Sequence, residues 1–167
     1  GATEAIRQSG LHCKTVAFSE INPQTTKMYR ALHGLDAMQL GDMTQVDIPT
    51  LKSLGDIDIL TAGFPCQSFS RLGKGLGWSC ERLQHLLGIL KGIVLYCKPK
   101  HILIENVKAI TEHPHSDGWE EFLKWFQWYG YSYSKHCGNP REMGYLQSRS
   151  RVFVAFSRND VEHWNIE

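Results

Sequence analysis

The amino-acid sequence predicts an α/β fold built around a mostly parallel, doubly wound sheet. Short apolar runs of strand length alternate along the chain with longer segments of helical periodicity, which is typical of strands joined by crossover helices. The chain has 167 residues, of which 42% are hydrophobic, and this is enough for one domain with a core of its own. We therefore expect residues 1–167 to form a single domain.

Three segments have the periodicity and the boundary residues of helices. The segment 22–34 begins with Asn and Pro and ends with Gly, and the segment 118–130 also ends with Gly, which are helix start and stop signals. The segment 82–97 has apolar residues at helical spacing. The aromatic side chains of 118–130 occupy more than one face, so we expect this helix to lie in the core beneath the sheet, with a docking face for a partner domain as the alternative.

Five segments read as strands because they are short and rich in apolar or β-branched residues. They are 14–19, 56–63, 101–106, 131–137 and 151–156. The opening of the chain breaks the pattern, because residues 1–10 read as a helix where a doubly wound sheet normally has a strand and a glycine-rich turn. Gly1 is all that could remain of that turn. We expect the chain to be trimmed relative to the natural one, with a gap in the middle of the sheet.

Composition excludes several classes of protein. The formal charge is +1, from 18 basic and 17 acidic residues, so any contact with nucleic acid must be local or be supplied partly by another domain. The five cysteines are widely spaced and include no CxxC pair, which argues against a zinc site and for free thiols in a reducing cytoplasm. No run approaches the roughly 20 apolar residues of a membrane span, and no leader segment is visible, so we expect neither a membrane protein nor a secreted one.

Acids and a thiol stand where strand-like runs end. Glu20, Asp42, Cys66 and Glu105 each end or follow such a run. Sheets of this kind bind ligands at the carboxyl ends of their strands. Side chains of this chemistry at strand ends are more than packing requires, so we expect a functional rim there.

Cys66 lies in the segment GFPCQSFS (63–70), directly after a predicted buried strand. A thiol attacks only as its thiolate, and a loop that leads from a strand toward a helix can expose the sulfur and aim backbone N–H groups at it. Pro65 fixes φ just before this position. The segment predicts a nucleophile, with a buried structural cysteine as an equal alternative.

Two further elements carry charge suited to chemistry. Glu105 follows the apolar run HILI, and a partly desolvated carboxylate at a strand end can act as an acid; the alternative is an ordinary helix-capping acid. Arg149 and Arg151 alternate, so on a strand both would point to one face. Two guanidinium groups on one face can grip a phosphate or a base carbonyl, and the alternative is a solvated strand edge.

The order and spacing of GFPCQSFS, ILIENV and QSRSRVFVAF resemble the DNA cytosine-5 methyltransferase family, and FSEINP and GDMTQVD fit the same family upstream. The resemblance covers nearly the whole chain, and the Pro-Cys-Gln and Glu-Asn-Val elements are its most specific parts. It implies a Rossmann-like, S-adenosylmethionine-dependent methyltransferase fold. It also implies an enzyme that methylates C5 of cytosine in double-stranded DNA, as in restriction–modification.

The resemblance also implies roles for the charged residues and the thiol. Cys66 would be the nucleophile that adds to C6 of a flipped-out cytosine, after which C5 takes the methyl group from S-adenosylmethionine. Glu105 would protonate or hydrogen-bond N3 of the base. Arg149 and Arg151 would orient the base and support the sulfur site.

A cofactor site is implied in the same way. Its residues are Glu20, Ile21, Asp42, Met43, Gly63 and Pro65. Glu20 would take the ribose hydroxyls and Ile21 would pack on adenine. Asp42, with Met43, would read the adenine amine, and the last two would line the methionine end. Without the resemblance, Glu20 and Asp42 read as plain strand-end acids.

The sequence departs from the family pattern in three places. The glycine-rich first motif is absent beyond Gly1, Leu146 stands where the family usually has proline, and no target-recognition region or closing motif follows the arginine segment. Target recognition would then come from a second subunit or domain. The alternatives to a DNA methyltransferase are a non-catalytic or degenerate fragment, a subunit of a split enzyme, and a tRNA cytosine-5 methyltransferase. We expect a location in the cytoplasm for a bacterial or phage-encoded protein, or in the nucleus for a eukaryotic one.

Overall fold

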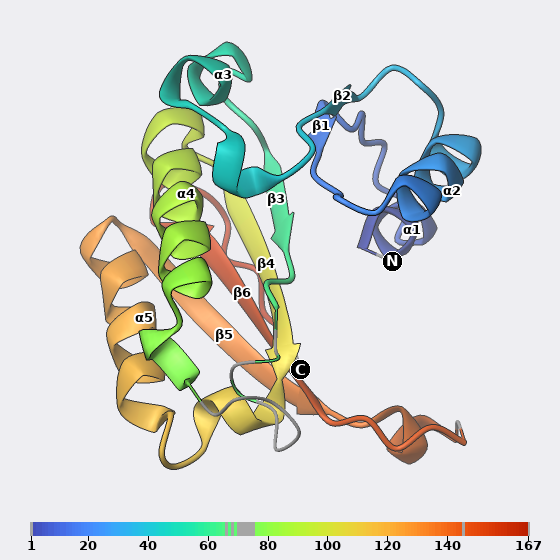
Figure 1. The fold of residues 1–167 in the computed structure, drawn as a ribbon. Helices are drawn as coiled ribbons and strands as arrows, with labels where there is room; N and C mark the ends of the chain where they lie inside the picture. Colours follow the sequence, from blue (N-terminus) through green and yellow to red (C-terminus); the bar gives the residue numbers. More distant parts are fainter. Residues whose placement is uncertain (1, 66, 68, 70–75, 145, 167) are drawn as a thin grey trace. The chain divides into compact units, whose positions relative to one another are not determined.

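A computed structural model describes residues 2–65, 67, 69, 76–144 and 146–166 of the chain (Figure 1). The chain forms two compact units. The first consists of residues 1–56 and 88–97, and the second of residues 57–87 and 98–167. No helix in the described part of the chain has both the length and the apolar character needed to cross a membrane.

The first unit holds short elements around a pair of parallel strands. Its elements are α1 (Ala2–Gln8), β1 (Ala17–Phe18), α2 (Pro23–His33), β2 (Met38–Gln39), a 3-10 turn η1 (Met43–Gln45), α3 (Ile48–Ser53) and the second half of α4 (Glu81–Cys97). The Asn22 side chain caps α2 by accepting from the backbone N–H groups of Gln24 and Thr25, so the predicted cap is confirmed. The Cys97 thiol donates to the Leu51 carbonyl at 3.2 Å, and burial raises the pKa of that thiol.

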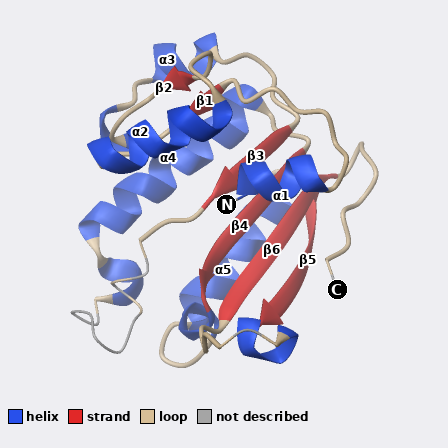
Figure 2. Ribbon diagram, turned by 90° about the vertical axis from the view of Figure 1, so that its right-hand side faces the viewer, coloured by secondary structure: helices blue, strands red, loops and turns tan. Residues whose placement is uncertain are grey.

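The second unit is built on a four-stranded sheet. Its elements are β3 (Ile59–Ala62), a 3-10 turn η2 (Gly77–Ser79), β4 (His101–Val107), η3 (Lys108–Thr111), α5 (Ser116–Trp128), β5 (Tyr131–Gly138), η4 (Pro140–Met143) and β6 (Arg151–Arg158). The strand order is β3-β4-β6-β5. β3 and β4 are parallel, and β6 is antiparallel to both of its neighbours (Figure 2). β3, β4 and β5 therefore run in one direction and β6 runs in the other.

The core of the second unit lies between one face of this sheet and α5 (Figure 1). Along β4 the side chains alternate, and Ile102, Ile104 and Asn106 are buried. Phe126 of α5 stacks on Phe156 of β6 with ring centroids 4.1 Å apart. The aromatic helix is thus a core helix, as predicted, although Trp128 at its end is 87% exposed.

The predicted α/β fold with mostly parallel strands is confirmed. All five predicted strands and all three predicted helices are present, with ends that differ by a few residues. The described strands form two sheets, one of two strands and one of four. The reversed direction of β6 is a feature that the sequence patterns do not indicate, because an apolar run of strand length carries no signal for the direction of pairing.

Candidate functional site

The carboxyl ends of β3 and β4 meet at one edge of the four-stranded sheet, because these neighbouring strands are parallel. Gly63 follows β3 directly, and a Cβ atom built on it would lie 3.4 Å from Oε2 of Glu105 in β4. Gly63, in the segment that leads to Cys66, therefore lies at the same rim as Glu105. Cys66 itself lies outside the described residues.

Arg151 forms an ion pair with Glu105 at this edge. The Arg151 Nε atom lies 2.7 Å from Glu105 Oε1. In the ladder Glu105 is opposite Phe153 and Arg151 is opposite Val107, so the pair runs diagonally across β4 and β6 on one face of the sheet. The Arg151 side chain is 15% exposed and that of Glu105 is 37% exposed. The Arg151 guanidinium is therefore largely shielded from water, while the Glu105 carboxylate remains partly exposed to water.

The predicted position of Arg149 on a strand is wrong. The prediction that Arg149 and Arg151 share one strand face assumes that both lie on a strand, but β6 begins at Arg151. Arg149 is exposed and precedes the ladder, and its backbone N–H donates to Oδ1 of Asn139 at 3.0 Å. The face argument therefore holds for Arg151 alone. The position of Arg149 is set by a side chain, which strand periodicity does not predict.

Asn106 is a site residue that the sequence reasoning missed. Its side chain is buried, donates through Nδ2 to the Phe64 carbonyl at 3.3 Å and accepts from the Val107 N–H at 2.8 Å. It thus ties the chain just before Pro65 to the end of β4. A polar residue at an inward position of the alternating run HILIENV was the available signal, because a buried amide needs partners.

An aromatic cluster lies at the start of α5. Phe69 is buried, and its ring centroid is 5.0 Å from that of Trp78 and 5.1 Å from that of His115. The Trp78 indole N–H donates to the His115 carbonyl at 2.8 Å. A Cβ on Gly118 would lie 2.3 Å from the Trp78 ring, so only glycine leaves room for the indole in this place. The cluster fixes Phe69 and Trp78 to the same part of α5.

The acids implied for the cofactor follow the strands of the first unit. Glu20 follows β1, and its Oε1 accepts from the Asn22 N–H at 2.8 Å. Asp42 follows β2, and its Oδ1 accepts from the N–H and the hydroxyl of Thr44, both at 2.9 Å. Both acids thus have the local contacts of ordinary strand-end acids.

The apolar members of the implied cofactor set are also present. Ile21 is 61% exposed, and Met43 is half-buried in η1. Gly63 and Pro65 belong to the second unit. The arrangement leaves an exposed apolar side chain beside an acid, which suits a nucleoside, and it does not by itself identify one.

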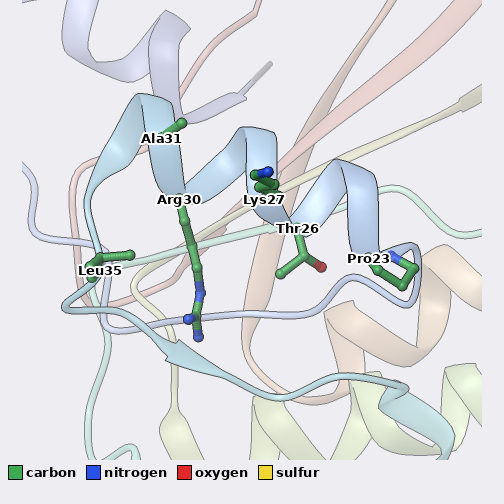
Figure 3. Close-up of a pocket in the computed structure, with 6 residues that line it drawn as sticks. All are labelled: Pro23, Thr26, Lys27, Arg30, Ala31 and Leu35. Carbon is green, nitrogen blue, oxygen red and sulfur yellow. The ribbon is translucent and has the colours of Figure 1, made fainter.

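A cavity in the first unit involves none of the predicted site residues. It has a volume of about 560 Å³ and lies beside α2 (Figure 3). Its lining residues are Pro23, Thr26, Lys27, Arg30, Ala31 and Leu35. A concave, partly apolar site is the usual first choice for a ligand site, but none of the residues predicted to carry the chemistry lines this cavity.

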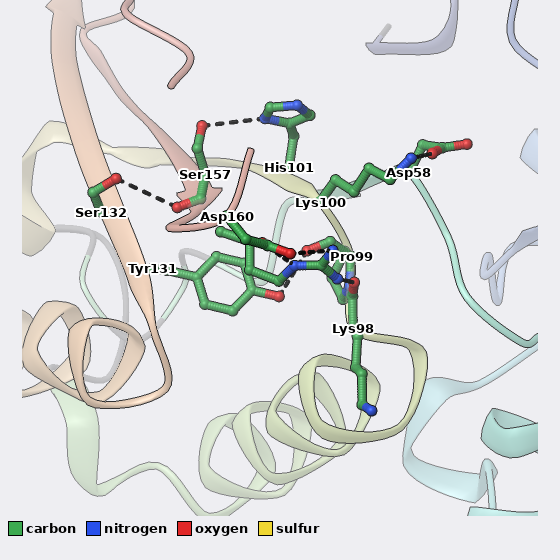
Figure 4. A network of polar contacts seen from close by, with 10 residues as sticks. Asp58, Lys98, Pro99, Lys100, His101, Tyr131, Ser132, Ser157 and Asp160 are labelled. Atoms are coloured by element: carbon green, nitrogen blue, oxygen red, sulfur yellow. Dashed lines mark hydrogen bonds and ion pairs between the residues drawn. The ribbon is translucent and has the colours of Figure 1, made fainter. Parts of the chain in front are cut away.

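The opposite edge of the four-stranded sheet holds a dense set of polar contacts (Figure 4). The Tyr131 hydroxyl donates to the Pro99 carbonyl at 2.7 Å, and burial raises the pKa of Tyr131 to about 12. Arg158 binds Asp160 through Nε at 2.5 Å and donates to the Lys98 carbonyl at 2.8 Å. These groups bond to one another across loops and strand ends, which is what a structural edge requires.

Comparison with known proteins gives the family. Residues 1–166 match the model of the family described as C-5 cytosine-specific DNA methylase. The chain belongs to this family. The methylase resemblance carried by the Pro-Cys-Gln and Glu-Asn-Val elements is confirmed.

Relatives of this DNA methylase chain include two bacterial proteins and a solved structure. It is 32% identical over 167 residues to the Type II methyltransferase M.NgoBV of Neisseria gonorrhoeae. The aligned region covers 94% of this chain and 38% of that protein. It is 35% identical over 150 residues to the Type II methyltransferase M.NlaX of Neisseria lactamica. Here the aligned region covers 89% of this chain and 46% of that protein. The S. pombe Dnmt2 methyltransferase matches with a TM-score of 0.72 and 20% identity over 99% of this chain and 48% of that one, a likeness in fold.

Two conclusions follow for the methylase chain. Its fold is that of Rossmann-like methyltransferases. The chain spans less than half the length of these three relatives.

Proposed function

We propose that this chain transfers a methyl group from S-adenosylmethionine to C5 of cytosine in double-stranded DNA, through a covalent adduct between Cys66 and a flipped-out base. The observation that carries the proposal is the Arg151–Glu105 ion pair at the shared carboxyl edge of β3 and β4, with Gly63 against the same carboxylate. In a chain of the DNA methylase family this is the place where an acid, an arginine and the segment that leads to a thiol come together.

The covalent step has a defined electron flow. The Cys66 thiolate forms a bond to C6, the C5–C6 π electrons shift into the C4–C5 bond and the C4–N3 π electrons shift onto N3, so that C5 becomes a nucleophilic, enamine-like carbon. S-adenosylmethionine, when bound, would supply the electrophilic methyl group that C5 takes; the S–CH3 bond breaks, and its electrons remain on the sulfur of the departing S-adenosylhomocysteine. A base then removes the proton from C5, the electrons reform the C5–C6 double bond, and the sulfur leaves as thiolate. Cys66 is thus regenerated.

Glu105 and Arg151 would serve the base during this cycle. Addition at C6 places electron density on the N3 side of the ring, and a proton or hydrogen bond at N3 stabilises it. One carboxylate oxygen of Glu105, Oε1, is held by Arg151, and the other, Oε2, faces Gly63, where no side chain covers it. Oε2 is therefore the atom that we assign to the base. We assign Arg149 to the same base-orienting group.

Six residues are assigned to the cofactor, each to one part of S-adenosylmethionine. Carboxylates accept ribose hydroxyls well, so we assign Glu20 to the ribose and Ile21, which is exposed, to the face of adenine. Asp42 and Met43 would contact the adenine edge. Gly63 and Pro65 would line the methionine end, because they precede Cys66 directly.

We propose that residues 1–167 act together as one catalytic domain on DNA. The near-neutral charge of the chain supports only local contacts with phosphate, so the reading of the target sequence would come from a further domain or subunit. The relatives named above include proteins of bacteria, and we propose that the reaction takes place in bacterial cytoplasm.

A covalent trap tests the proposal. The chain is mixed with S-adenosylmethionine and DNA that carries 5-fluorocytosine, and the intact mass is measured. Fluorine does not leave C5 as a proton does, so a working enzyme stays attached to the DNA. Cys66→Ser should abolish the adduct. Cys137→Ser, which removes an exposed free thiol of the second unit, is the matched control and should keep it. No adduct with the unaltered chain would overturn the proposal for this chain.

A further inference from the structure

The contacts that join β5 to β6 change from backbone to side chain just before Arg151. The regular ladder between the two strands ends at the pair Gly138 and Arg151. Beyond that pair, the side chain of Asn139, the residue that follows β5, bonds to described residues on both sides of the connection. Hydrogen bonds from the Asn139 side chain thus replace the backbone ladder for the residues that precede Arg151.

The Asn139 amide uses its full hydrogen-bonding capacity. Its Oδ1 accepts from the backbone N–H groups of Arg141 at 3.2 Å and Arg149 at 3.0 Å. Its Nδ2 donates to the hydroxyls of Ser148 at 3.2 Å and Ser150 at 3.4 Å. An asparagine amide has two acceptor lone pairs and two donor hydrogens, so each is engaged, and the two ends of the connection 139–150 are fastened together.

These contacts continue to the proposed catalytic carboxylate. The Ser150 carbonyl accepts from Nη1 of Arg151 at 2.9 Å, while the hydroxyl of Ser150 is held by Asn139. Arg151 in turn binds Glu105 at 2.7 Å. A continuous polar path therefore runs from Asn139 through Ser150 and Arg151 to Glu105.

We infer that Asn139 is a positioning residue for methyl transfer, which sets the backbone of Arg149 and the guanidinium of Arg151 relative to Glu105. The inference rests on the function proposed above. Asn139 acts through the arginines. Its importance follows from the steep dependence of rate on placement, since a misplacement of about 1 Å can cost about 100-fold in rate.

Substitutions separate this role from simple capping. Asn139→Ala removes all of the contacts, while Asn139→Ser keeps an oxygen that can cap Arg141 on the short turn η4 but cannot also bind Arg149 and the two serines. Ser148→Ala with Ser150→Ala removes only the contacts of Nδ2. Asp47→Ala is the matched control, because Asp47 caps α3 in the first unit by accepting from the Thr50 N–H at 2.8 Å.

Two measurements are made on the same set of variants. Amide hydrogen exchange by NMR reports whether Arg149 is held, and it does not depend on any reaction. We expect the Arg149 amide to exchange at least about tenfold faster in Asn139→Ala than in the unaltered chain, because its acceptor is lost. The second measurement is the rate constant of adduct formation on 5-fluorocytosine DNA at saturating DNA and cofactor. We expect a fall of about 10- to 100-fold, with unchanged affinity for DNA that lacks the fluorinated base.

The outcomes distinguish the two proposals. Faster exchange at Arg149 together with a slower adduct rate supports the inference, provided that Asp47→Ala changes neither. Unchanged exchange at Arg149 overturns it whatever the adduct assay gives. Faster exchange with an unchanged adduct rate also overturns it and leaves the proposed function standing. Absence of an adduct with the unaltered chain overturns the proposed function, and the positioning role falls with it.

A variant that fails to fold is recognised by the loss of its NMR signals. If this happens with Asn139→Ala, the paired serine substitution decides, because it keeps both backbone contacts of Oδ1. It should lower the adduct rate in the same direction and by less. An adduct rate equal to that of the unaltered chain would then contradict the inference.

Discussion

The two ends of strand β6 each carry an arginine, and the two arginines are bound in opposite ways. Arg158 binds Asp160, two residues along the chain, and the carbonyl of Lys98. Arg151 binds Glu105, which is far away in the sequence and comes from the neighbouring strand. At the Arg158 end the polar groups bond to each other. At the Arg151 end the second oxygen of the paired carboxylate faces Gly63, which has no side chain of its own to cover it.

This difference shows what separates a structural edge from a functional one in the same sheet. Near Arg158, Tyr131 and His101 are also engaged, through Pro99 and Ser157. Near Arg151 the ion pair holds the Glu105 carboxylate through one of its two oxygens, Oε1. The same residue type on the same strand thus closes the fold at one end and presents a reactive group at the other.

The largest effect is expected from removing Arg151. Arg151→Ala deletes the guanidinium that holds Glu105, and the loss of one such preorganised group costs about 10²- to 10³-fold in rate. We expect the rate constant of adduct formation on 5-fluorocytosine DNA to fall by this amount. Arg158→Ala is the control at the other end of β6, and it should lower Tm while the adduct rate stays the same. Equal adduct rates in the two variants would show that the two ends do not differ in function.

A second test concerns the aromatic cluster at the start of α5. Gly118→Ala places a Cβ 2.3 Å from the Trp78 ring, so the indole must move. We expect the free energy of unfolding to fall by about 1–3 kcal/mol in urea titrations. The control is Gly88→Ala in α4, where the new Cβ meets nothing within 4 Å; there we expect a gain of about 0.5–1 kcal/mol. A loss of similar size at both glycines would mean that helix propensity, rather than the indole contact, governs position 118.

A third and smaller effect is expected at the structural edge. Tyr131→Phe removes the buried hydroxyl that binds the Pro99 carbonyl, which should lower the free energy of unfolding by about 1 kcal/mol and leave the adduct rate unchanged. The pKa of this hydroxyl is raised from 10.0 to about 12 by burial. Above pH 10 the unfolded chain loses this proton while the folded chain keeps it, so stability falls as pH rises toward 12. Urea midpoints between pH 9 and pH 12 should fall more steeply in the unaltered chain than in the variant, and parallel curves would contradict this.

The smallest effect is expected from Asp58, which pairs with Lys100 at 2.7 Å on the surface near the structural edge. The bond from Lys100 lowers the pKa of Asp58, so its contribution is present above the ordinary value of 3.8 and is lost as pH falls below it. Both side chains are at least half exposed, and such pairs are worth at most about 0.5–1 kcal/mol. Asp58→Asn should therefore change the unfolding midpoint at pH 7 only slightly. A large loss would mean that this pair helps to hold the edge together.

The elements of the fold were predictable because their signals are local. Asn22 and Pro23 predict the start of α2, and the alternation of HILIENV predicts β4. The direction of β6 was not predictable, because strand pairing depends on residues that are distant in the sequence. The same limit applies to the site. The sequence analysis singled out Glu105 and Arg151, but only the antiparallel pairing of β4 with β6 brings them together.

The residues that hold the site were harder to find than the charged groups. Asn106 and Asn139 were not predicted as site residues, yet each binds backbone atoms next to a predicted functional residue. Arg149 was placed on a strand by its spacing, whereas the side chain of Asn139 sets its position. The alternation of HILIENV marks Asn106 as a buried polar residue, but no sequence pattern says which backbone atoms Asn106 or Asn139 binds, and these contacts were therefore missed.

The closure of the β5–β6 connection by Asn139 also bears on how such a chain can change during evolution. Because Asn139 binds Arg141 on one side of the connection and Ser148, Arg149 and Ser150 on the other, we expect residues inserted between Arg141 and Ser148 to lengthen the loop and to leave the register of β6 unchanged. A residue inserted within β6 has a different result, since a shift by one position would turn Arg151 to the other face of the sheet. The loop is thus free to lengthen and diversify, while the strand that begins at its far end must keep its register.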